Sequence, residues 1–585
     1  MRKRWALWTL LWRALRWHLP IVGVLAVAQG TLPVAAILAS GLLIDSIPAA
    51  PGRALTGLVL LGAASLASAG LSAMLDCYTQ VLDGRYAETL HRTVAQATLD
   101  TPGIAVLEDP GVAGELAALE EFERVDGHLG TVGNLRALVT QRITGAGALV
   151  VLFTFAWWAP LVMLVGWRAL SHGIGRWFEH GMALGSTIGA AQMGRARYLR
   201  GLAVEPHAAK EIRVFGLGGW LVEAYAETYM NALRAIWRGR KLGMRTILAA
   251  TGVVTASHAL VLGMLGWQAA AGIVSVAQVV VFVQAVLGSS AQGYLFGVEV
   301  PLARARQVAW QTLRLARRTA AAPRPRGQLP PGPLEVRLTG VRFTYPAGDK
   351  PTLDGLDLRI PAGQSLAIVG ENGAGKSTLI KLLCGLYEPD VGRVRVGDEE
   401  PVSARHRIGV IFQNFTRYEL PLRANVEFGS LGGGAEVVAR ALSDAGADEL
   451  AQALPSREET VLSARYPGGQ DLSGGQWQKV ALARALAAVH GGAGLLILDE
   501  PTSSLDVRAE TELFERFMEF TEDVTTILVS HRLASVRHAD RIVVVAGGRV
   551  VEDGTHEELM AANGRYAAMF ALQASRFNLE GAGHD

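Results

Sequence analysis

The sequence predicts a two-domain protein: an all-α domain of six membrane-crossing helices, followed by an α/β domain. The chain has 585 residues, which is too long for a single hydrophobic core. Half of its residues are hydrophobic and only 18% are charged, whereas soluble domains carry about 25% charged residues. Long apolar runs occur only before residue 299, and a proline-rich linker and a soluble composition follow.

The first 17 residues contain four tryptophans that alternate with basic residues. Arg13 and Arg16 interrupt the apolar run, and no small-residue cleavage site follows, so a secretory signal is not indicated. The pattern is typical of an amphipathic helix lying on the cytoplasmic membrane surface. A helix packed against the rest of the protein is the alternative.

Six apolar segments are candidates to cross a bilayer about 30 Å thick. They comprise residues 19–44, 54–75, 143–158, 161–167, 247–268 and 274–298. The fourth segment is the weakest candidate, because Arg168 follows only seven apolar residues. It is either shielded by neighbouring helices or has a different boundary.

The loops between these segments predict the orientation. The three turns expected outside the cell, 45–53, 158–160 and 269–273, contain one basic residue, Arg53. The N-terminus and the two long charged regions are rich in arginine and lysine, and basic segments remain in the cytoplasm. We therefore expect a multi-pass protein of the cell membrane, surrounded by lipid, with both termini in the cytoplasm.

Polar residues within predicted membrane spans are functional candidates. Asp76 and Glu299 lie near span ends, where solvation at the interface explains them. His258 and Gln284 are better candidates to line a cavity, with hydrogen bonds between helices as an equal alternative. Gln292 lies in the sixth span.

Composition argues against two other classes of site. The net charge of +2 gives no support to a nucleic-acid partner. The two cysteines, Cys77 and Cys384, lie in an apolar segment and in a predicted helix. We interpret both as small buried hydrophobic residues, without a disulfide or a metal.

Proline and glycine concentrate shortly before the second domain. We expect the membrane domain over residues 1–318, a linker over 319–333 and the second domain over 334–575. Residues 365–369 form a short apolar run typical of a buried strand, and a helical pattern begins near residue 376.

A glycine-rich loop lies between that strand and that helix, in the order that a phosphate-binding loop requires. Its backbone N–H groups and the helix N-terminus favour phosphate. Lys376 is placed to reach the β- and γ-phosphates, and Ser377 to bind Mg²⁺. The residues expected to bind ATP in this loop are Gly370, Glu371, Asn372, Gly373, Ala374, Gly375, Lys376, Ser377 and Thr378.

Polar residues follow the other predicted strands of this domain. In open α/β sheets ligands gather at the carboxyl ends of the strands. A parallel strand ending at Asp499 brings this carboxylate beside Mg²⁺, and Glu500 next to a water that attacks the γ-phosphate. Gln413 is placed to reach Mg²⁺ or that water, and His531 the γ-phosphate. Tyr345 is a candidate to stack on a purine ring.

Residues 472–476, Leu-Ser-Gly-Gly-Gln, begin a second helix with features of an anion site. Ser473 is a natural N-cap, and the two glycines allow an anion to approach closely. The first loop already binds the phosphates of one nucleotide. The second site therefore predicts a second chain that faces the first head to tail.

These motifs resemble those of the ATP-binding cassette (ABC) exporters of the half-transporter type, in which one chain carries membrane domain and ATPase. Residues 370–378 resemble the Walker A motif, 472–476 the signature motif, 495–499 the Walker B motif and 504–506 the D-loop. The resemblance makes Glu500 the catalytic glutamate. It also implies that Gln413, His531 and Tyr345 are the Q-loop, H-loop and A-loop residues.

The resemblance implies a type I exporter fold and a dimer, formed with an identical chain or a paralogous half-transporter. Two ATP molecules are then held between the Walker A loop of one chain and the signature residues of the other. The signature-side and D-loop residues that it implies at ATP are Ser473, Gly475, Gln476 and Asp506.

The same resemblance assigns coupling helices to the cytoplasmic tips near Pro110 and near residues 205–209. One position departs from the family. Many exporters have a glutamate five residues before the signature leucine, in a loop that senses these helices, whereas this chain has Pro467. This difference calls the usual contact into question.

Residues 412–418 and 468–479 resemble bacterial lantibiotic and modified-peptide exporters. We therefore expect ATP-driven export of a peptide, without cleavage of a leader peptide, since no segment resembles the cysteine-protease domain. A lipid or a hydrophobic drug is the alternative cargo. A membrane-anchored ATPase that acts as a sensor partner or immunity factor is the alternative class. Import is disfavoured, because importers usually carry the two domains on separate chains.

Overall fold

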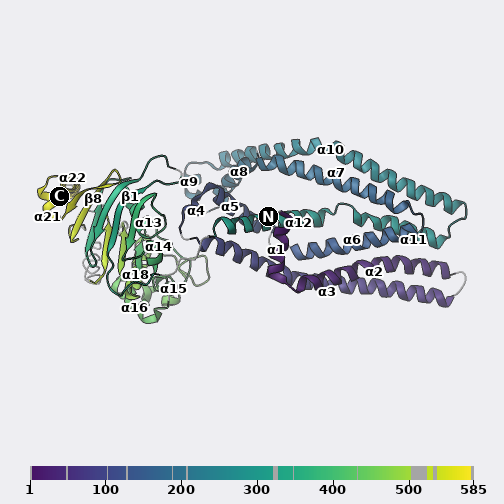
Figure 1. The fold of residues 1–585 in the computed structure, drawn as a ribbon, viewed down its shortest axis with the longest axis horizontal. Helices are drawn as coiled ribbons and strands as arrows, with labels where there is room; N and C mark the ends of the chain where they lie inside the picture. Colours follow the sequence, from purple (N-terminus) through teal and green to yellow (C-terminus); the bar gives the residue numbers. More distant parts are fainter. Residues whose placement is uncertain are drawn as a thin grey trace. The chain divides into compact units, whose positions relative to one another are not determined.

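A computed structural model of the chain shows two compact units (Figure 1). The helical unit contains Met1–Gln96 and Glu115–Arg317, and the sheet unit contains Ala97–Gly114 and Arg318–Asp585. The structure describes residues 3–47, 51–101, 103–126, 130–187, 189–205, 208–320, 327–346, 348–430, 432–501, 523–530 and 536–581.

The helical unit consists of helices, several of which are much longer than a membrane span (Figure 1). The helices that lie wholly or mainly in it are α1 (Lys3–Leu15), α2 (His18–Ser46), α3 (Pro51–Leu99), α5 (Pro110–Asp126), α6 (Thr131–Phe153), α7 (Ala159–Thr187), α8 (Gly189–Val204), α9 (Ala209–Val214), α10 (Gly218–Ala270), α11 (Val276–Gly288) and α12 (Phe296–Arg318). The charged regions expected between spans are thus largely continuations of the apolar helices.

Five helical segments among the described residues are long and apolar enough to cross a membrane. They are His18–Ser46, Gly52–Leu99, Thr131–Phe153, Met244–Ala270 and Val276–Arg318. The expected fourth span lies in α7, which is a continuous helix but is not one of the five. Six crossings therefore stay a prediction.

The expected sixth span, 274–298, is not one continuous helix. Its first part, α11, ends at Gly288 and a 3₁₀ turn covers Ser289–Gln292 before α12 begins at Phe296. The guanidinium of Arg142, on α6, donates to the carbonyl oxygens of Ala291 at 3.0 Å and Gly293 at 2.9 Å. This side chain therefore donates hydrogen bonds to two backbone carbonyls at the position where the helix is interrupted.

Arg142 also forms an ion pair with Glu299, in the first turn of α12. In return, Gln292 donates to the backbone oxygen of Arg142 at 2.9 Å. Glu299 and Gln292, which the sequence places near the end of the sixth span, thus help to hold the break in place.

The other polar candidates in the helices also have protein partners. Gln284 accepts a hydrogen bond from Ser40 of α2 at 3.2 Å, as the alternative of hydrogen bonding between helices predicts. Asp76 pairs with Arg136 of α6 at 2.5 Å. The ring of His258 bonds to the carbonyl of Val254 on its own helix at 2.7 Å.

Helix α1 has two different faces. Its leucines at positions 7, 10, 11 and 15 are buried, whereas Trp5, Trp8 and Trp12 are exposed. Each of the two expectations for this segment thus describes one face: the leucines pack on protein, and the indole rings lie outward. The prediction of two buried cysteines is only half right, because Cys384 is buried and Cys77 is exposed.

The sheet unit contains two sheets and the helices that cover them. A three-stranded antiparallel sheet has the order β2-β1-β4, from β1 (Val336–Phe343), β2 (Leu353–Ile360) and β4 (Val391–Val396). A six-stranded sheet has the order β5-β6-β7-β3-β8-β9, from β3 (Ser365–Val369), β5 (Ile408–Ile411), β6 (Leu495–Asp499), β7 (Thr525–Val529), β8 (Arg541–Ala546) and β9 (Arg549–Gly554).

The helices of the sheet unit are mostly short. They are α4 (Ala105–Glu108), α13 (Lys376–Leu383), α14 (Pro401–Ala404), α15 (Leu422–Glu427), α16 (Gly434–Asp444), α17 (Asp448–Ala453), α18 (Gly474–His490), α21 (His556–Ala561) and α22 (Arg565–Gly581). Apart from α4, which lies in the range expected for the membrane domain, these helices and the two sheets form the α/β domain that the sequence predicts.

Strand β3 lies between two hydrophobic cores. Leu366 and Ile368 belong to one core and Ala367 and Val369 to the other. A strand covered on both faces needs a continuous apolar run, and this explains the unbroken sequence before the glycine-rich loop.

Candidate nucleotide-binding site

The glycine-rich loop connects β3 to α13 through backbone conformations that favour glycine. Gly370, Gly373 and Gly375 have φ angles of 156°, 81° and 107°. A Cβ at Gly370 would lie 2.2 Å from the carbonyl oxygen of Val545, and one at Gly375 would lie 2.7 Å from Leu353. The loop therefore keeps its shape only with glycine at these two positions, and it leads directly into the N-terminus of α13.

Lys376 is the first residue of α13 and is only 6% exposed. Its ammonium donates to the carbonyl oxygens of Gly370 at 2.7 Å and Glu371 at 3.0 Å. Burial lowers the pKa of Lys376, and the nearby carboxylates of Glu500 and Asp499 oppose that shift. The predicted phosphate-binding lysine therefore lies within electrostatic reach of both predicted carboxylates.

The sheet order explains why these groups converge. Strands β5, β6, β7 and β3 are neighbours in this order, and each adjacent pair is parallel. Their carboxyl ends therefore form one edge. The expected parallel strand before Asp499 is β6, and β7 lies between it and β3. Asp499 ends β6 and is 4% exposed.

Glu500 follows β6 in a left-handed backbone conformation, with a φ of 52°. This is uncommon for a residue other than glycine, asparagine or aspartate. Its N–H donates to the carbonyl of Val529 at 2.9 Å, and its carboxylate accepts a hydrogen bond from Gln413 at 2.8 Å. Sequence reasoning placed Gln413 and Glu500 at the same edge but did not predict this bond.

Tyr345, the predicted adenine platform, lies beside the phosphate loop. Its hydroxyl shares a hydrogen bond with that of Thr378 at 3.0 Å. The ammonium of Lys381 lies 5.2 Å from the ring centroid of Tyr345 and 5.7 Å from that of Tyr387. Lys381 and Tyr387 were missed from the sequence, because neither belongs to a motif.

The signature segment forms the helix start that the sequence predicts. Ser473 is the N-cap of α18, and a capping box joins its hydroxyl to the N–H of Gln476 at 3.3 Å and its N–H to the Gln476 side chain at 2.9 Å. Ser473 is exposed, and Gly475 is half-buried.

The side chains expected to bind Mg²⁺ supply the right kind of ligand. Ser377, Asp499 and Gln413 offer a hydroxyl, a carboxylate and an amide oxygen. Mg²⁺ prefers such hard oxygen ligands, with few carboxylates and with phosphate oxygens of the nucleotide completing its shell. The described residues contain no group of three His, Cys, Asp or Glu side chains suited to a metal.

Two predicted site residues lie outside the described residues. They are Asp506, with the rest of the D-loop, and His531. Ser530, the residue before His531, follows the end of β7 and is buried.

The family model described as ABC transporter matches residues 353–503. This match contains the glycine-rich loop, Gln413, the signature segment, Asp499 and Glu500. Residues 353–503 are an ABC transporter ATPase domain. The chain thus combines several long apolar helices with an ABC ATPase.

Curated relatives align over less than half of the chain. A 40% identical stretch of 243 residues, 41% of this chain and of the relative, is shared with an ATP-dependent lipid A-core flippase of Chromohalobacter salexigens. A mycobactin import ATP-binding/permease protein of Mycolicibacterium thermoresistibile is 39% identical over 261 residues, 44% of this chain and 42% of that protein.

A subtilin transport ATP-binding protein of Bacillus subtilis is 39% identical over 232 residues, 38% of this chain and 37% of that protein. Each of these matches spans about two fifths of the relative. Their names differ in cargo, and one of them states import, although the aligned stretches are about equally similar to this chain.

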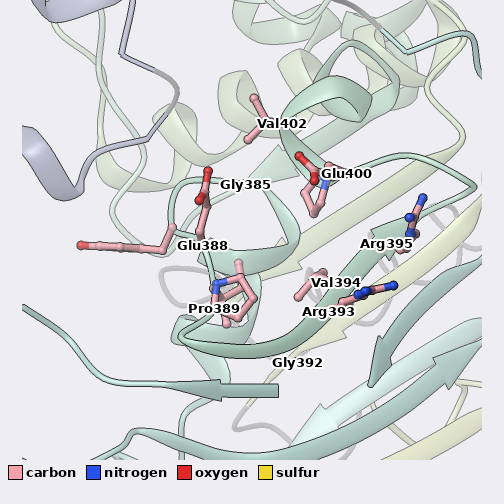
Figure 2. Close-up of a pocket in the computed structure, with 12 residues that line it drawn as sticks. Gly385, Glu388, Pro389, Gly392, Arg393, Val394, Arg395, Glu400 and Val402 are labelled. Carbon is pink, nitrogen blue, oxygen red and sulfur yellow. The ribbon is translucent and has the colours of Figure 1, made fainter. Parts of the chain in front are cut away.

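A surface cavity of about 500 Å³ lies elsewhere in the sheet unit. Figure 2 shows Arg393 and Arg395 on one side and Glu388 and Glu400 near its other walls. None of the predicted ATP-binding residues lines it. Tyr387, however, borders the cavity and also touches Tyr345.

Proposed function

We propose that the protein is an ABC half-transporter that couples ATP hydrolysis to export of a cargo across the cell membrane. The observation that carries this proposal is the convergence of the glycine-rich loop, Asp499, Glu500 and Gln413 at one edge of the parallel sheet. In this proposal the apolar helices of the same chain form the membrane pathway, and ATP hydrolysis drives export of the cargo through it.

The residues at this edge fit in-line attack of water on the γ-phosphate. The loop N–H groups and the Lys376 ammonium bind the phosphates and offset charge that develops on them. Ser377, Asp499 and Gln413 would hold Mg²⁺, which neutralises phosphate charge when bound. Glu500 orients and polarises the attacking water, and the hydrogen bond from Gln413 fixes its carboxylate. His531 stabilises the γ-phosphate.

The second side of each ATP comes from a second chain in this proposal, an identical copy or a paralogue. The Ser473 hydroxyl oxygen accepts the N–H of Gln476, so its own O–H remains available to donate to a phosphate oxygen. We expect the N–H of Gly475, in the first turn of α18, to bind the same anion. By the same resemblance, Asp506 of the D-loop contributes to this shared site.

A modified peptide is the cargo we favour. The segments 412–418 and 468–479 resemble lantibiotic exporters, and one relative is named for subtilin transport. The flippase relatives support lipid as the second candidate. The argument against import from domain fusion is weakened, because a relative named as an ATP-binding/permease protein imports mycobactin.

The test uses the full chain in lipid nanodiscs, with Glu500→Gln and, as a matched control, Glu436→Gln on the exposed surface of α16. We expect Glu500→Gln to lower ATP hydrolysis at least about 100-fold while ATP binding persists, and the control to match wild type. Wild-type hydrolysis by Glu500→Gln contradicts the proposed site.

Transport is measured in inverted vesicles that contain the full chain. ATP-dependent uptake of a labelled lantibiotic supports peptide export, and ATP-dependent flipping of a labelled lipid without peptide uptake supports the lipid alternative. ATP hydrolysis with neither movement favours a sensor or immunity ATPase.

A further inference from the structure

The segment that joins α3 to α5 packs within the sheet unit. The N–H of Ile104 donates to the carbonyl of Leu386 at 2.9 Å. A Cβ at Gly103 would lie 2.6 Å from this carbonyl oxygen, so the close approach favours glycine. The hydroxyl of Tyr387 donates to the carboxylate of Glu108, the last residue of α4. Helix α4 is thus fixed to the loop that follows α13.

Tyr387 also contacts the predicted adenine platform. Its side chain is 4% exposed, and its ring meets that of Tyr345 edge-on, with centroids 5.4 Å apart and an interplanar angle of 85°. Lys381 lies near both rings, and Tyr345 is bonded to Thr378. A continuous series of contacts therefore leads from Glu108 through Tyr387 and Tyr345 to the phosphate loop.

Helix α4 is connected to two helices that enter the helical unit. Asp109, directly after α4, accepts the N–H of Val112 at 3.0 Å and so caps α5. Its carboxylate also pairs with Arg318, the last residue of α12, at 3.1 Å. A shift of α4 therefore reaches the start of α5 and the end of α12 through one residue.

The loop that carries Tyr387 borders the cavity shown in Figure 2, with Gly385, Tyr387 and Glu388 in its wall. Burial and the Glu108 carboxylate raise the pKa of Tyr387. Its hydroxyl therefore keeps its proton, and remains a donor to Glu108, throughout the physiological range.

We propose that Tyr387 is a positioning residue through which stacking of the nucleotide base on Tyr345 is transmitted to Glu108 and helix α4. This inference rests on the proposed function, because it takes Tyr345 as the base platform.

The test is hydrogen exchange of the full chain in nanodiscs, with Mg²⁺ and the β,γ-imido analogue of ATP. We expect the analogue to slow exchange of residues 103–108 by about tenfold in wild type. Inorganic tripolyphosphate with Mg²⁺ lacks a base, so we expect it to protect residues 370–378 but not 103–108.

Two variants break the same bond from opposite ends. Tyr387→Phe removes the donor hydroxyl and keeps the ring, and Glu108→Ala removes the acceptor carboxylate. We expect both to lose the effect at 103–108 and to keep protection of 370–378. Tyr566→Phe, which removes a tyrosine hydroxyl bonded to His556, is the matched control and should respond as wild type.

The outcomes separate this inference from the proposed function. Full protection of 103–108 in Tyr387→Phe, or equal protection by tripolyphosphate, overturns the role of Tyr387. Protection of 370–378 in wild type without any change at 103–108 overturns it too, and leaves the ATP site intact. If the analogue does not protect 370–378 in wild type, the assignment of the ATP site itself fails.

Discussion

Gln413 donates a hydrogen bond from its side-chain nitrogen to the carboxylate of Glu500, over 2.8 Å. The two residues come from different strand ends, β5 and β6, which are adjacent and parallel. Glu500 also has an unusual positive φ angle, and such strain at a site is consistent with a function. The orientation of the carboxylate thus depends on a neighbour 87 residues earlier in the sequence.

We predict that Gln413→Ala lowers the kcat of ATP hydrolysis by about tenfold to 100-fold, because a misplaced base loses much of its contribution. The KM for ATP should change less, since the phosphate loop still binds the nucleotide. Steady-state kinetics of the full chain measure both. Asn414→Ala alters the neighbouring exposed amide side chain and should leave kcat unchanged. Equal kcat in Gln413→Ala and wild type contradicts the prediction.

The lowered pKa of Lys376 predicts that ATP affinity depends on pH. An ordinary lysine loses its proton near pH 10.4, and burial moves that loss to lower pH. The cationic form binds phosphate, so affinity should fall with rising pH before an ordinary lysine titrates. Phosphate groups are already ionised above about pH 8.

Calorimetric titration of Mg·ATP between pH 7 and pH 10 checks this expectation. Adenosine carries no phosphate, so its weaker binding should not follow the same pH profile. In Lys376→Met the affinity should be low at every pH. A wild-type affinity that stays constant up to pH 10 speaks against a lowered pKa of Lys376.

The sequence predicts the fold around the phosphate loop better than the membrane helices, for a physical reason. The phosphate loop is local: its strand, glycines and helix start lie within a few residues of one another, and residues 365–383 fold as expected. The Gln413–Glu500 bond and the ring contact of Tyr387 with Tyr345 depend on tertiary packing. No short pattern encodes such contacts.

The break between α11 and α12 is a similar case. Residues 274–298 form an apolar run without proline, so periodicity predicts one helix. The partner that stabilises the open carbonyls is Arg142, on a helix about 150 residues earlier. Gly288 and Gly293, which flank the 3₁₀ turn, were a local hint.

This arrangement predicts unequal effects of two variants. Arg142→Met removes the donor to two backbone carbonyls as well as the ion pair, and should lower stability by roughly 2 kcal/mol or more. Glu299→Gln leaves the carbonyl bonds intact and should cost less. Thermal unfolding of both variants in the same detergent gives the order. A larger loss for Glu299→Gln contradicts a structural role of Arg142 at the break.

Arg407 anchors the end of the linker to the sheet unit, and its replacement should destabilise that unit. The side chain is 9% exposed and donates to the backbone oxygens of Leu329 at 3.3 Å, Gly332 at 2.7 Å and Gly492 at 2.6 Å, and also to that of Pro330. Lysine keeps the charge but cannot reach several carbonyls with one planar group.

We therefore expect Arg407→Lys to cost about 2 kcal/mol, which lowers the unfolding temperature of a domain of this size by about 4 to 8 °C. Arg440→Lys is the matched control, because Arg440 is exposed and its contact with Asp444 is long, at 3.9 Å. Differential scanning calorimetry of the full chain measures both variants.

ATP should raise the unfolding temperature of Arg407→Lys by as much as that of wild type, because Arg407 contacts the linker and does not belong to the nucleotide site. A normal melting temperature for Arg407→Lys means that the linker end is stabilised by its apolar contacts alone.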